Sequence, residues 1–158
     1  MLGPLPSIRV VFAIIEEQGR FLITQRQCSA SFPGLWEFPS GRVEEGEADE
    51  VALKRELLER IGIAVAIERQ SATRSHMYKT YAVDSVLYHA KILPGHRPRP
   101  LRVADFRWVT AQEIDQYAFP PADQATMDEL WGIGHGNHSS LRLSLEGANG
   151  HAQQGGNL

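Results

Sequence analysis

Apolar and polar positions alternate along most of the chain in short runs that predict β-strands. β-Branched and aromatic residues concentrate in these runs, and Gly, Pro and polar residues separate them, which is typical of strands and turns. We predict six strands, at 8–16, 19–27, 35–41, 63–77, 81–93 and 105–109. A Glu-Gln-Gly turn joins the first two, which favours a hairpin or two neighbouring buried strands. The proline-rich stretch 94–102 is predicted to be a loop.

A different period begins at Ala48. Apolar side chains at Leu53, Leu57 and Ile61 recur at i, i+4 and i+8 with charged residues elsewhere, which predicts an amphipathic helix that ends at Gly62. We predict two further helices, a brief one at 111–117 with Thr110 as its N-cap and an amphipathic one at 122–133. The elements together indicate an α+β fold in which strands outnumber helices.

Length and composition narrow the function classes. The 158 residues suffice for one domain, which we expect at 1–133, followed by a flexible tail rich in Gly, Asn and His at 134–158. A formal charge of −3 argues against bulk binding to nucleic acid or to an anionic membrane. The lone Cys28 and the short apolar run at 10–15 favour a cytoplasmic protein without a membrane span.

Acidic residues gather on one edge of the predicted helix. Glu56 and Glu59 are three positions apart, and Arg60 is four from Glu56, so all three project from the same edge. Two neighbouring carboxylates repel each other unless a cation is bound, and hard oxygen ligands of this kind suit Mg²⁺ or Mn²⁺. An acidic helix face that simply contacts water is the alternative that this spacing leaves open.

The wider pattern from residue 41 to residue 63 is far more specific. It resembles the Nudix box, G-x5-E-x7-R-E-U-x-E-E-x-G-U with U aliphatic, at every fixed position except Arg60. The matching residues are Gly41, Glu47, Arg55, Glu56, Leu57, Glu59, Gly62 and Ile63. The preceding strand and the FPPAD stretch at 119–123 also resemble MutT-type members of this family, so the resemblance covers about residues 8–132.

The resemblance implies a Nudix fold, a mixed β-sheet sandwiched between α-helices, and the cleavage of phosphoanhydride bonds with Mg²⁺ or Mn²⁺. It assigns metal binding to Glu56 and Glu59, with Glu56 alternatively a base that acts through a bound water. It also assigns the backbone carbonyl of Ser40 to the metal, and it pairs Arg55 with Glu47 to hold the loop against the helix.

Arg60 departs from the pattern, because active family members usually have a metal-binding Glu at this position. Three interpretations remain open. The enzyme is active, with Glu44, Glu45 or another acid completing the metal shell while Arg60 turns to water or holds a substrate phosphate. Alternatively, the domain binds a ligand without turnover. In the third, Arg60 forms an ordinary bridge to Glu56 or Glu59 and the metal site is weak.

Several further residues are candidates for substrate contact. Arg26 and Lys79 are potential phosphate ligands, with solvated surface cations as the alternative. Phe38 is a candidate to flank the base or else a core residue. Asp123 is a candidate for the base edge or a helix N-cap, and Asp in place of the Asn of 8-oxoguanine-selective relatives leaves cytidine nucleotides open. Asp105 is the nearest downstream acid to complete a metal shell.

These observations lead to one main hypothesis and one rival. The main hypothesis is a MutT-like pyrophosphohydrolase that converts a nucleoside triphosphate, an oxidised one included, to nucleotide and pyrophosphate or phosphate. The rival is a degenerate, non-catalytic Nudix domain that binds a nucleotide or a damaged base, since residues 34–40 resemble the end domain of MutY-type adenine glycosylases. The resemblance also suggests a homodimer.

Overall fold

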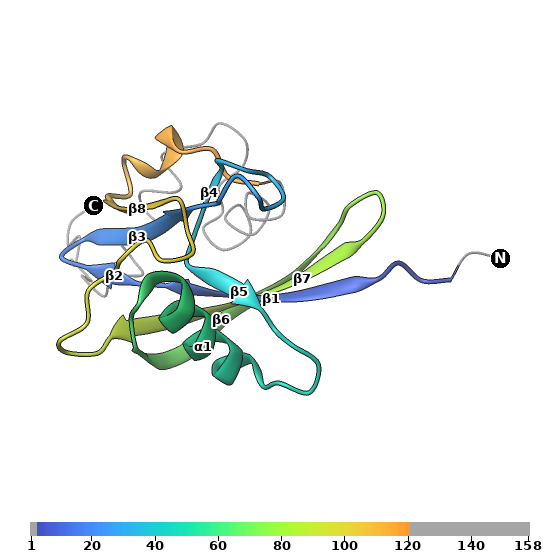
Figure 1. The fold of residues 1–158 in the computed structure, drawn as a ribbon, viewed down its shortest axis with the longest axis horizontal. Helices are drawn as coiled ribbons and strands as arrows, with labels where there is room; N and C mark the ends of the chain where they lie inside the picture. The colour runs from blue at the N-terminus through green and yellow to red at the C-terminus, as the bar shows by residue number, and fades with distance from the viewer. Residues whose placement is uncertain (1–2, 121–158) are drawn as a thin grey trace, which may run out of the picture.

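The computed structural model describes residues 3–120, which form two four-stranded sheets and, among these residues, a single α-helix. Figure 1 labels the strands and the helix along the ribbon. Their bounds are β1 Ser7–Ile14, β2 Glu16–Glu17, β3 Arg20–Gln25, β4 Trp36–Glu37, β5 Ser40–Arg42, α1 Asp49–Ile61, β6 Val65–Met77, β7 Ala82–Ile92, β8 Asp105–Val109 and the 3₁₀ turn η1 Ile114–Gln116.

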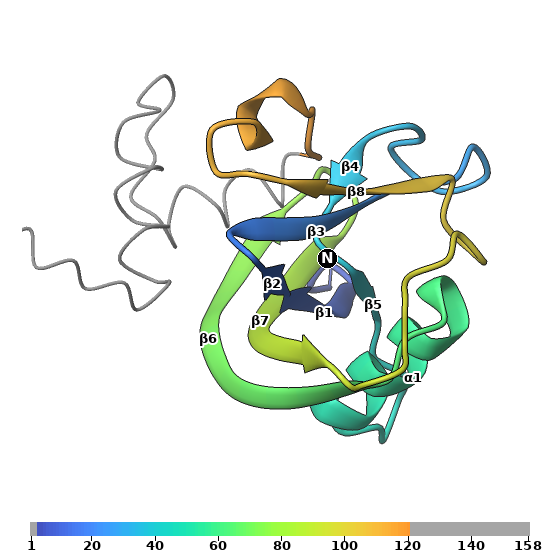
Figure 2. The ribbon, with the colours of Figure 1, turned by 90° about the vertical axis from the view of Figure 1, so that its left-hand side faces the viewer.

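The first sheet is mixed and runs in the order β5-β1-β7-β6. Strand β1 pairs in parallel with β7, whereas the β1–β5 and β6–β7 pairs are antiparallel. In the second sheet β3 pairs antiparallel with β2, β4 and β8. Figure 2 shows β6 and β7 curving strongly around β1, with β3 and β8 to one side and α1 near β5.

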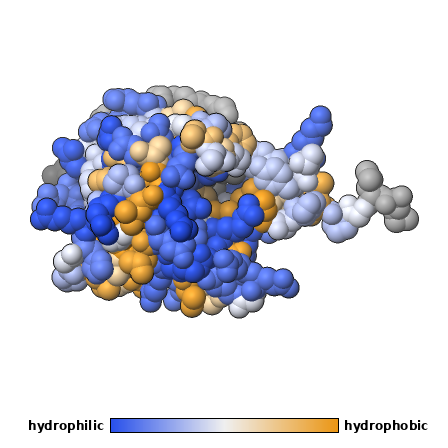
Figure 3. Space-filling model, in the orientation of Figure 1, coloured by the Kyte–Doolittle hydropathy of each residue, from blue (hydrophilic) through white to orange (hydrophobic). Residues whose placement is uncertain are grey.

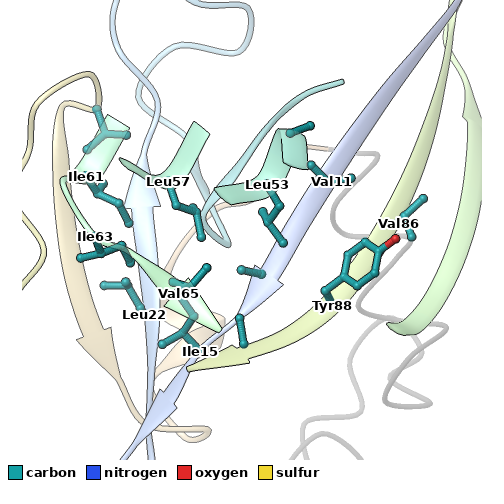
Figure 4. Packing of buried hydrophobic residues seen from close by; sticks show 14 residues of the cluster. Val11, Ile15, Leu22, Leu53, Leu57, Ile61, Ile63, Val65, Val86 and Tyr88 are labelled. Atoms are coloured by element: carbon teal, nitrogen blue, oxygen red, sulfur yellow. The ribbon is translucent and has the colours of Figure 1, made fainter. Parts of the chain in front are cut away.

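The core consists of two apolar layers, one on each face of the first sheet. Val11, Ala13 and Ile15 point to the helix side, where they meet the Leu53 and Leu57 side chains of α1 in the cluster drawn in Figure 4. Alternate residues such as Phe12 belong to a second cluster, shared with β3 and β8. Strand β1 is therefore buried on both faces, and the layers run helix, first sheet, second sheet.

Both ends of α1 are fixed to the rest of the molecule. At the start, Arg9 donates two 2.7 Å hydrogen bonds to Asp49, which also accepts one from the Tyr88 hydroxyl at 3.0 Å. The Arg9 guanidinium holds the pKa of the Asp49 carboxyl below its ordinary value. At the end, Gly62 adopts the left-handed conformation with φ 70° and donates its N–H to helix carbonyls, as the sequence predicts for a C-cap.

The predictions for α1, for the strands 63–77, 81–93 and 105–109 and for the 94–102 loop are confirmed. The predicted strand 35–41 divides at Phe38 into β4 and β5, which belong to different sheets. The first two predicted strands do not form one hairpin, since β1 and β3 also lie in different sheets and only the short β2 pairs with β3.

The predicted helix 111–117 is only the short 3₁₀ turn η1. Ile114 is its one buried residue, so the segment has no apolar stripe that would pack a longer helix against the core. The N-cap is Glu113 and not Thr110, whose carbonyl accepts the Glu113 N–H at 3.1 Å and whose hydroxyl donates to the Glu113 carboxylate at 3.0 Å. The predicted helix 122–133 and tail 134–158 lie outside the described residues, so a second helical layer is not described either. Within residues 3–120 no helix is long and apolar enough to span a membrane.

Candidate active site

The acidic edge of α1 faces a recess that we call the charged hollow, with a volume of ≈ 210 Å³. Glu56, Glu59 and Arg60 all line it, which is the grouping that helical spacing predicts. The remaining lining residues come from the β3–β4 region and from the loop after β7. They are Arg26, Gln27, Ala30, Glu37, Arg102 and Val103.

Glu56 is the most enclosed acid on the helix, with 8% of its surface exposed. Arg55 donates to its Oε1 at 2.6 Å, and Arg60 pairs with its Oε2 through Nε at 2.9 Å. Strand β5 approaches so closely that a Cβ added to Gly41 would lie 2.1 Å from the same Oε2. A glycine at 41 therefore makes room for the Glu56 carboxylate beside the Ser40–Gly41 peptide.

Arg55 ties the loop before α1 to the helix. Its Nε and Nη2 donate to the two carboxylate oxygens of Glu47 at 2.8 and 2.9 Å, and Nη2 also donates to the Arg42 carbonyl at 3.1 Å. These bonds from Arg55, together with the Glu44 backbone N–H, lower the pKa of Glu47 from 4.5 to about 2. Arg55 therefore orients Glu56 and holds the loop in place with one guanidinium.

The opposite wall of the charged hollow is an ion pair that spacing on the helix could not predict. The pairing of β3 with β4 sets Thr24 opposite Glu37 and brings Glu37 within 2.8 Å of the Arg26 guanidinium. The Glu37 side chain is only 5% exposed. Arg26 also donates to the backbone carbonyl and the hydroxyl of Ser31, so it holds the connecting loop in a fixed position.

Arg26 and Glu37 also line a second recess of ≈ 340 Å³, which we call the aromatic hollow. Phe32, Tyr78 and Tyr81 form its ring-bearing wall, where Tyr78 stacks on Tyr81 at 4.9 Å and lies 5.5 Å from Phe32. Its other lining residues are Ile8, Val10, Phe12, Ser31, Arg42, Val83 and Pro120. In Figure 3 hydrophobic atoms are visible in a recess near the centre of a mainly hydrophilic face.

The structure brings together some of the predicted site residues and separates others. Ser40 is buried in β5 beside the charged hollow. Phe38 is 3% exposed and packs against Phe119 in the core, and Lys79 is exposed at the β6–β7 turn; neither lines either hollow. Asp123 lies outside the described residues.

The other acids considered for a metal shell lie elsewhere. Glu44 and Glu45 are exposed in the loop before α1, and the Asp105 carboxylate pairs with Arg107. None of the three lines the charged hollow.

Sequence reasoning missed three contributors to the two hollows. Glu37 could have been noticed as an acid between Trp36 and Phe38 in an apolar strand. The cluster of Phe32, Tyr78 and Tyr81 had no local signal, because residues from distant turns form it. The sequence around Arg102 also carried no local signal that this residue lies near α1.

The oxygen donors of the charged hollow suit a hard divalent ion in kind but not in number. The Glu56 carboxylate adjoins the Ser40–Gly41 peptide and Glu59 lines the same hollow, and carboxylate and carbonyl oxygens are the ligands that Mg²⁺ and Mn²⁺ prefer. Across residues 3–120, however, His, Cys, Asp and Glu side chains form no group of three or more that could hold a metal ion. Glu56 and Glu59, with the Ser40 carbonyl, would hold a divalent ion, and the Arg60 guanidinium lies beside these donors through its pair with Glu56.

Comparison with known proteins agrees with this geometry. The NUDIX domain family matches residues 10–129. The chain is 33% identical over 123 residues to the CTP pyrophosphohydrolase of Escherichia coli K12, covering 75% of this chain and 87% of that one. It is 34% identical over 125 residues to the 8-oxo-dGTP diphosphatase of Haemophilus influenzae, covering 78% and 90%.

A solved structure has the same fold. The solution structure of the E. coli ORF135 protein superposes with a TM-score of 0.65 at 26% identity, over 98% of this chain and 99% of that one. The named relatives are hydrolases of phosphoanhydride bonds in nucleotides, which supports an enzyme over a non-catalytic binding module. Nudix hydrolases generally need divalent metal ions. With its Nudix pattern at 41–63 and these matches, the chain belongs to the NUDIX domain family.

Proposed function

We propose that this protein is a Mg²⁺- or Mn²⁺-dependent pyrophosphohydrolase of nucleoside triphosphates. The observation that carries the proposal is that Arg26 and Glu37 form a wall shared by the charged hollow and the aromatic hollow. A nucleotide has the same two parts, an aromatic base and a charged polyphosphate, joined by a ribose. Its two ends therefore match the two recesses in chemistry and in order.

The base would occupy the aromatic hollow. Tyr78, Tyr81 and Phe32 offer ring faces, and stacking on such rings accepts any base. Lys79 at the hairpin turn is proposed as a further phosphate contact and Asp123 as a contact to the base edge. The selectivity among bases would then depend on the residue at 123 more than on the ring wall.

The phosphates would extend past Arg26 into the charged hollow. Arg26 donates to the phosphate closest to the ribose, since a guanidinium fork matches phosphate oxygens. Glu56 and Glu59 would hold the divalent ion with the Ser40 carbonyl. The ion, when bound, neutralises phosphate charge and makes a bound water more acidic.

Hydrolysis needs a water oxygen to form a bond to phosphorus while the bond from that phosphorus to the bridging oxygen breaks. The bridging oxygen keeps the electron pair, and pyrophosphate or phosphate leaves with it. We assign the proton of the water to Glu56, which Arg55 and Gly41 hold in one position.

The substrate class follows from the relatives and from the site. The relatives named for CTP and for 8-oxo-dGTP both act on nucleoside triphosphates, so we propose that class, with oxidised purines and cytidine nucleotides as the first candidates. Cellular pools of these nucleotides also favour a cytoplasmic protein. We retain the homodimer as a prediction.

A product assay tests the proposal. The native protein is incubated with 8-oxo-dGTP, CTP, dCTP, dATP and ADP-ribose in Mg²⁺ or Mn²⁺, and pyrophosphate and phosphate are measured separately. We expect turnover of at least one triphosphate and no turnover of ADP-ribose. The proposal is wrong if no triphosphate is cleaved while the protein binds nucleotides without a metal.

A further inference from the structure

The side chain that breaks the Nudix pattern lies inside the proposed phosphate site. Arg60 lines the charged hollow with Arg26 and Arg102, so three guanidinium groups line one recess together with three carboxylates, those of Glu37, Glu56 and Glu59. The Arg60 side chain is 34% exposed and uses Nε to pair with Glu56. A guanidinium carries five N–H donors, so the pair with Glu56 through Nε does not use the donors on the two Nη atoms of this hollow-lining side chain.

The backbone fixes Arg102 and Arg60 close to each other. The N–H groups of Leu101 and Arg102 both donate to the Arg60 carbonyl, at 3.1 and 2.9 Å. The Arg102 guanidinium in turn lies 3.7 Å from Glu59. Two cations therefore flank the two helix carboxylates, and both are attached to the same end of α1.

The charge difference between Arg60 and the glutamate of the Nudix pattern equals the charge of one divalent ion. An acidic residue at this position, as the Nudix pattern has, would make the charged hollow two units more negative. Two units is the charge of one divalent ion. Polyphosphate binding in a recess needs that positive charge from some source, because phosphate groups repel carboxylates.

We propose that Arg60 is a resident cation of the polyphosphate site, which contacts phosphate oxygens directly and takes the place of one divalent ion. This inference deepens the proposed function and rests on it for the identity of the ligand. Since guanidinium binding to phosphate needs no metal, the protein should hold a polyphosphate in the absence of metal and should bind fewer divalent ions than an acidic variant.

The test measures binding, not turnover. Affinity for tripolyphosphate in excess EDTA is measured by calorimetry for the native protein, Arg60→Gln, Arg60→Lys and Arg60→Glu. We expect Arg60→Gln to weaken binding by about 10- to 100-fold and Arg60→Lys to lose less, because it keeps the charge. Binding of Mn²⁺ alone, counted by electron paramagnetic resonance, should be at least about tenfold tighter in Arg60→Glu.

Arg20→Glu is the matched control, since it makes the same charge change at an exposed position at the start of β3, outside the charged hollow. Thermal unfolding by circular dichroism checks that each variant is folded. A purely structural bridge from Arg60 to Glu56 would lower the melting temperature of Arg60→Gln and leave tripolyphosphate affinity unchanged.

The outcomes separate this inference from the proposed function. One outcome is that the native protein cleaves a triphosphate, but its affinities for tripolyphosphate and for Mn²⁺ do not depend on residue 60. That outcome would overturn the inference and leave the proposed hydrolase function intact. Polyphosphate binding that depends on Arg60, in a protein that cleaves no triphosphate, would support the inference and refute the hydrolase.

Discussion

Replacing Gly41 by alanine should disable the proposed active site through Glu56 alone. The added Cβ would lie 2.0 Å from Cγ, 2.1 Å from Oε2 and 2.3 Å from Cβ of Glu56. Ordinary contact begins near 3.4 Å, so the glutamate or strand β5 must withdraw by about 1.4 Å. A misplacement of that size at a catalytic group costs about 10²-fold in rate.

Overpacking of this kind should also cost about 1–3 kcal/mol of stability, which lowers the melting temperature by about 2–12 °C. Gly19→Ala is the matched control: its φ is +75° and nothing lies within 4 Å of an added Cβ, so it strains the backbone far from the site. We expect Gly19→Ala to lose stability and keep its kcat.

Steady-state kcat and a double-mutant cycle with Glu56→Gln complete the test. Because Gly41→Ala acts through Glu56, it should cause little further loss in a protein that already lacks that carboxylate. Two losses that simply multiply, or a Gly41→Ala protein with native kcat, would refute the reasoning.

Three further predictions concern Glu47, Arg55 and the base-stacking Tyr81. Because the pKa of Glu47 falls from 4.5 to about 2, its contribution to stability is complete above pH 4.5 and is lost as pH falls towards 2. Glu47→Gln should lack that loss, and carboxyl NMR should place the Glu47 midpoint near 2 and not near 4.5. Arg55→Lys keeps the charge without the fork and should lower kcat by about 10- to 100-fold; a native rate would mean that charge alone suffices. Tyr81→Ala should raise KM for the nucleotide with little change in kcat, and an equal fall in kcat would argue against a base-binding role.

The sequence predicted α1 well because its signals are local. The spacing of Leu53, Leu57 and Ile61 determines which face is buried, and Gly62 supplies the left-handed residue that ends the helix. The same spacing correctly grouped Glu56, Glu59 and Arg60 on one edge.

Other features depend on contacts between distant residues, and local patterns do not encode them. Strand β1 is apolar at successive positions because it is buried on both faces, and such a run does not reveal that its parallel partner is β7. The Arg26–Glu37 pair depends on the register of β3 with β4. Spacing allowed Arg60 to pair with either Glu56 or Glu59, and the structure selects the more enclosed Glu56.

The most direct test of the central claim is pyrophosphate release from the best triphosphate by the native protein and by Glu56→Gln. Glu50→Gln, an exposed acid in the same helix, is the control. The account predicts that Glu56→Gln lowers kcat by about 10²- to 10⁴-fold with unchanged nucleotide binding, while Glu50→Gln behaves as the native protein does. Equal rates for the native protein and Glu56→Gln would contradict it.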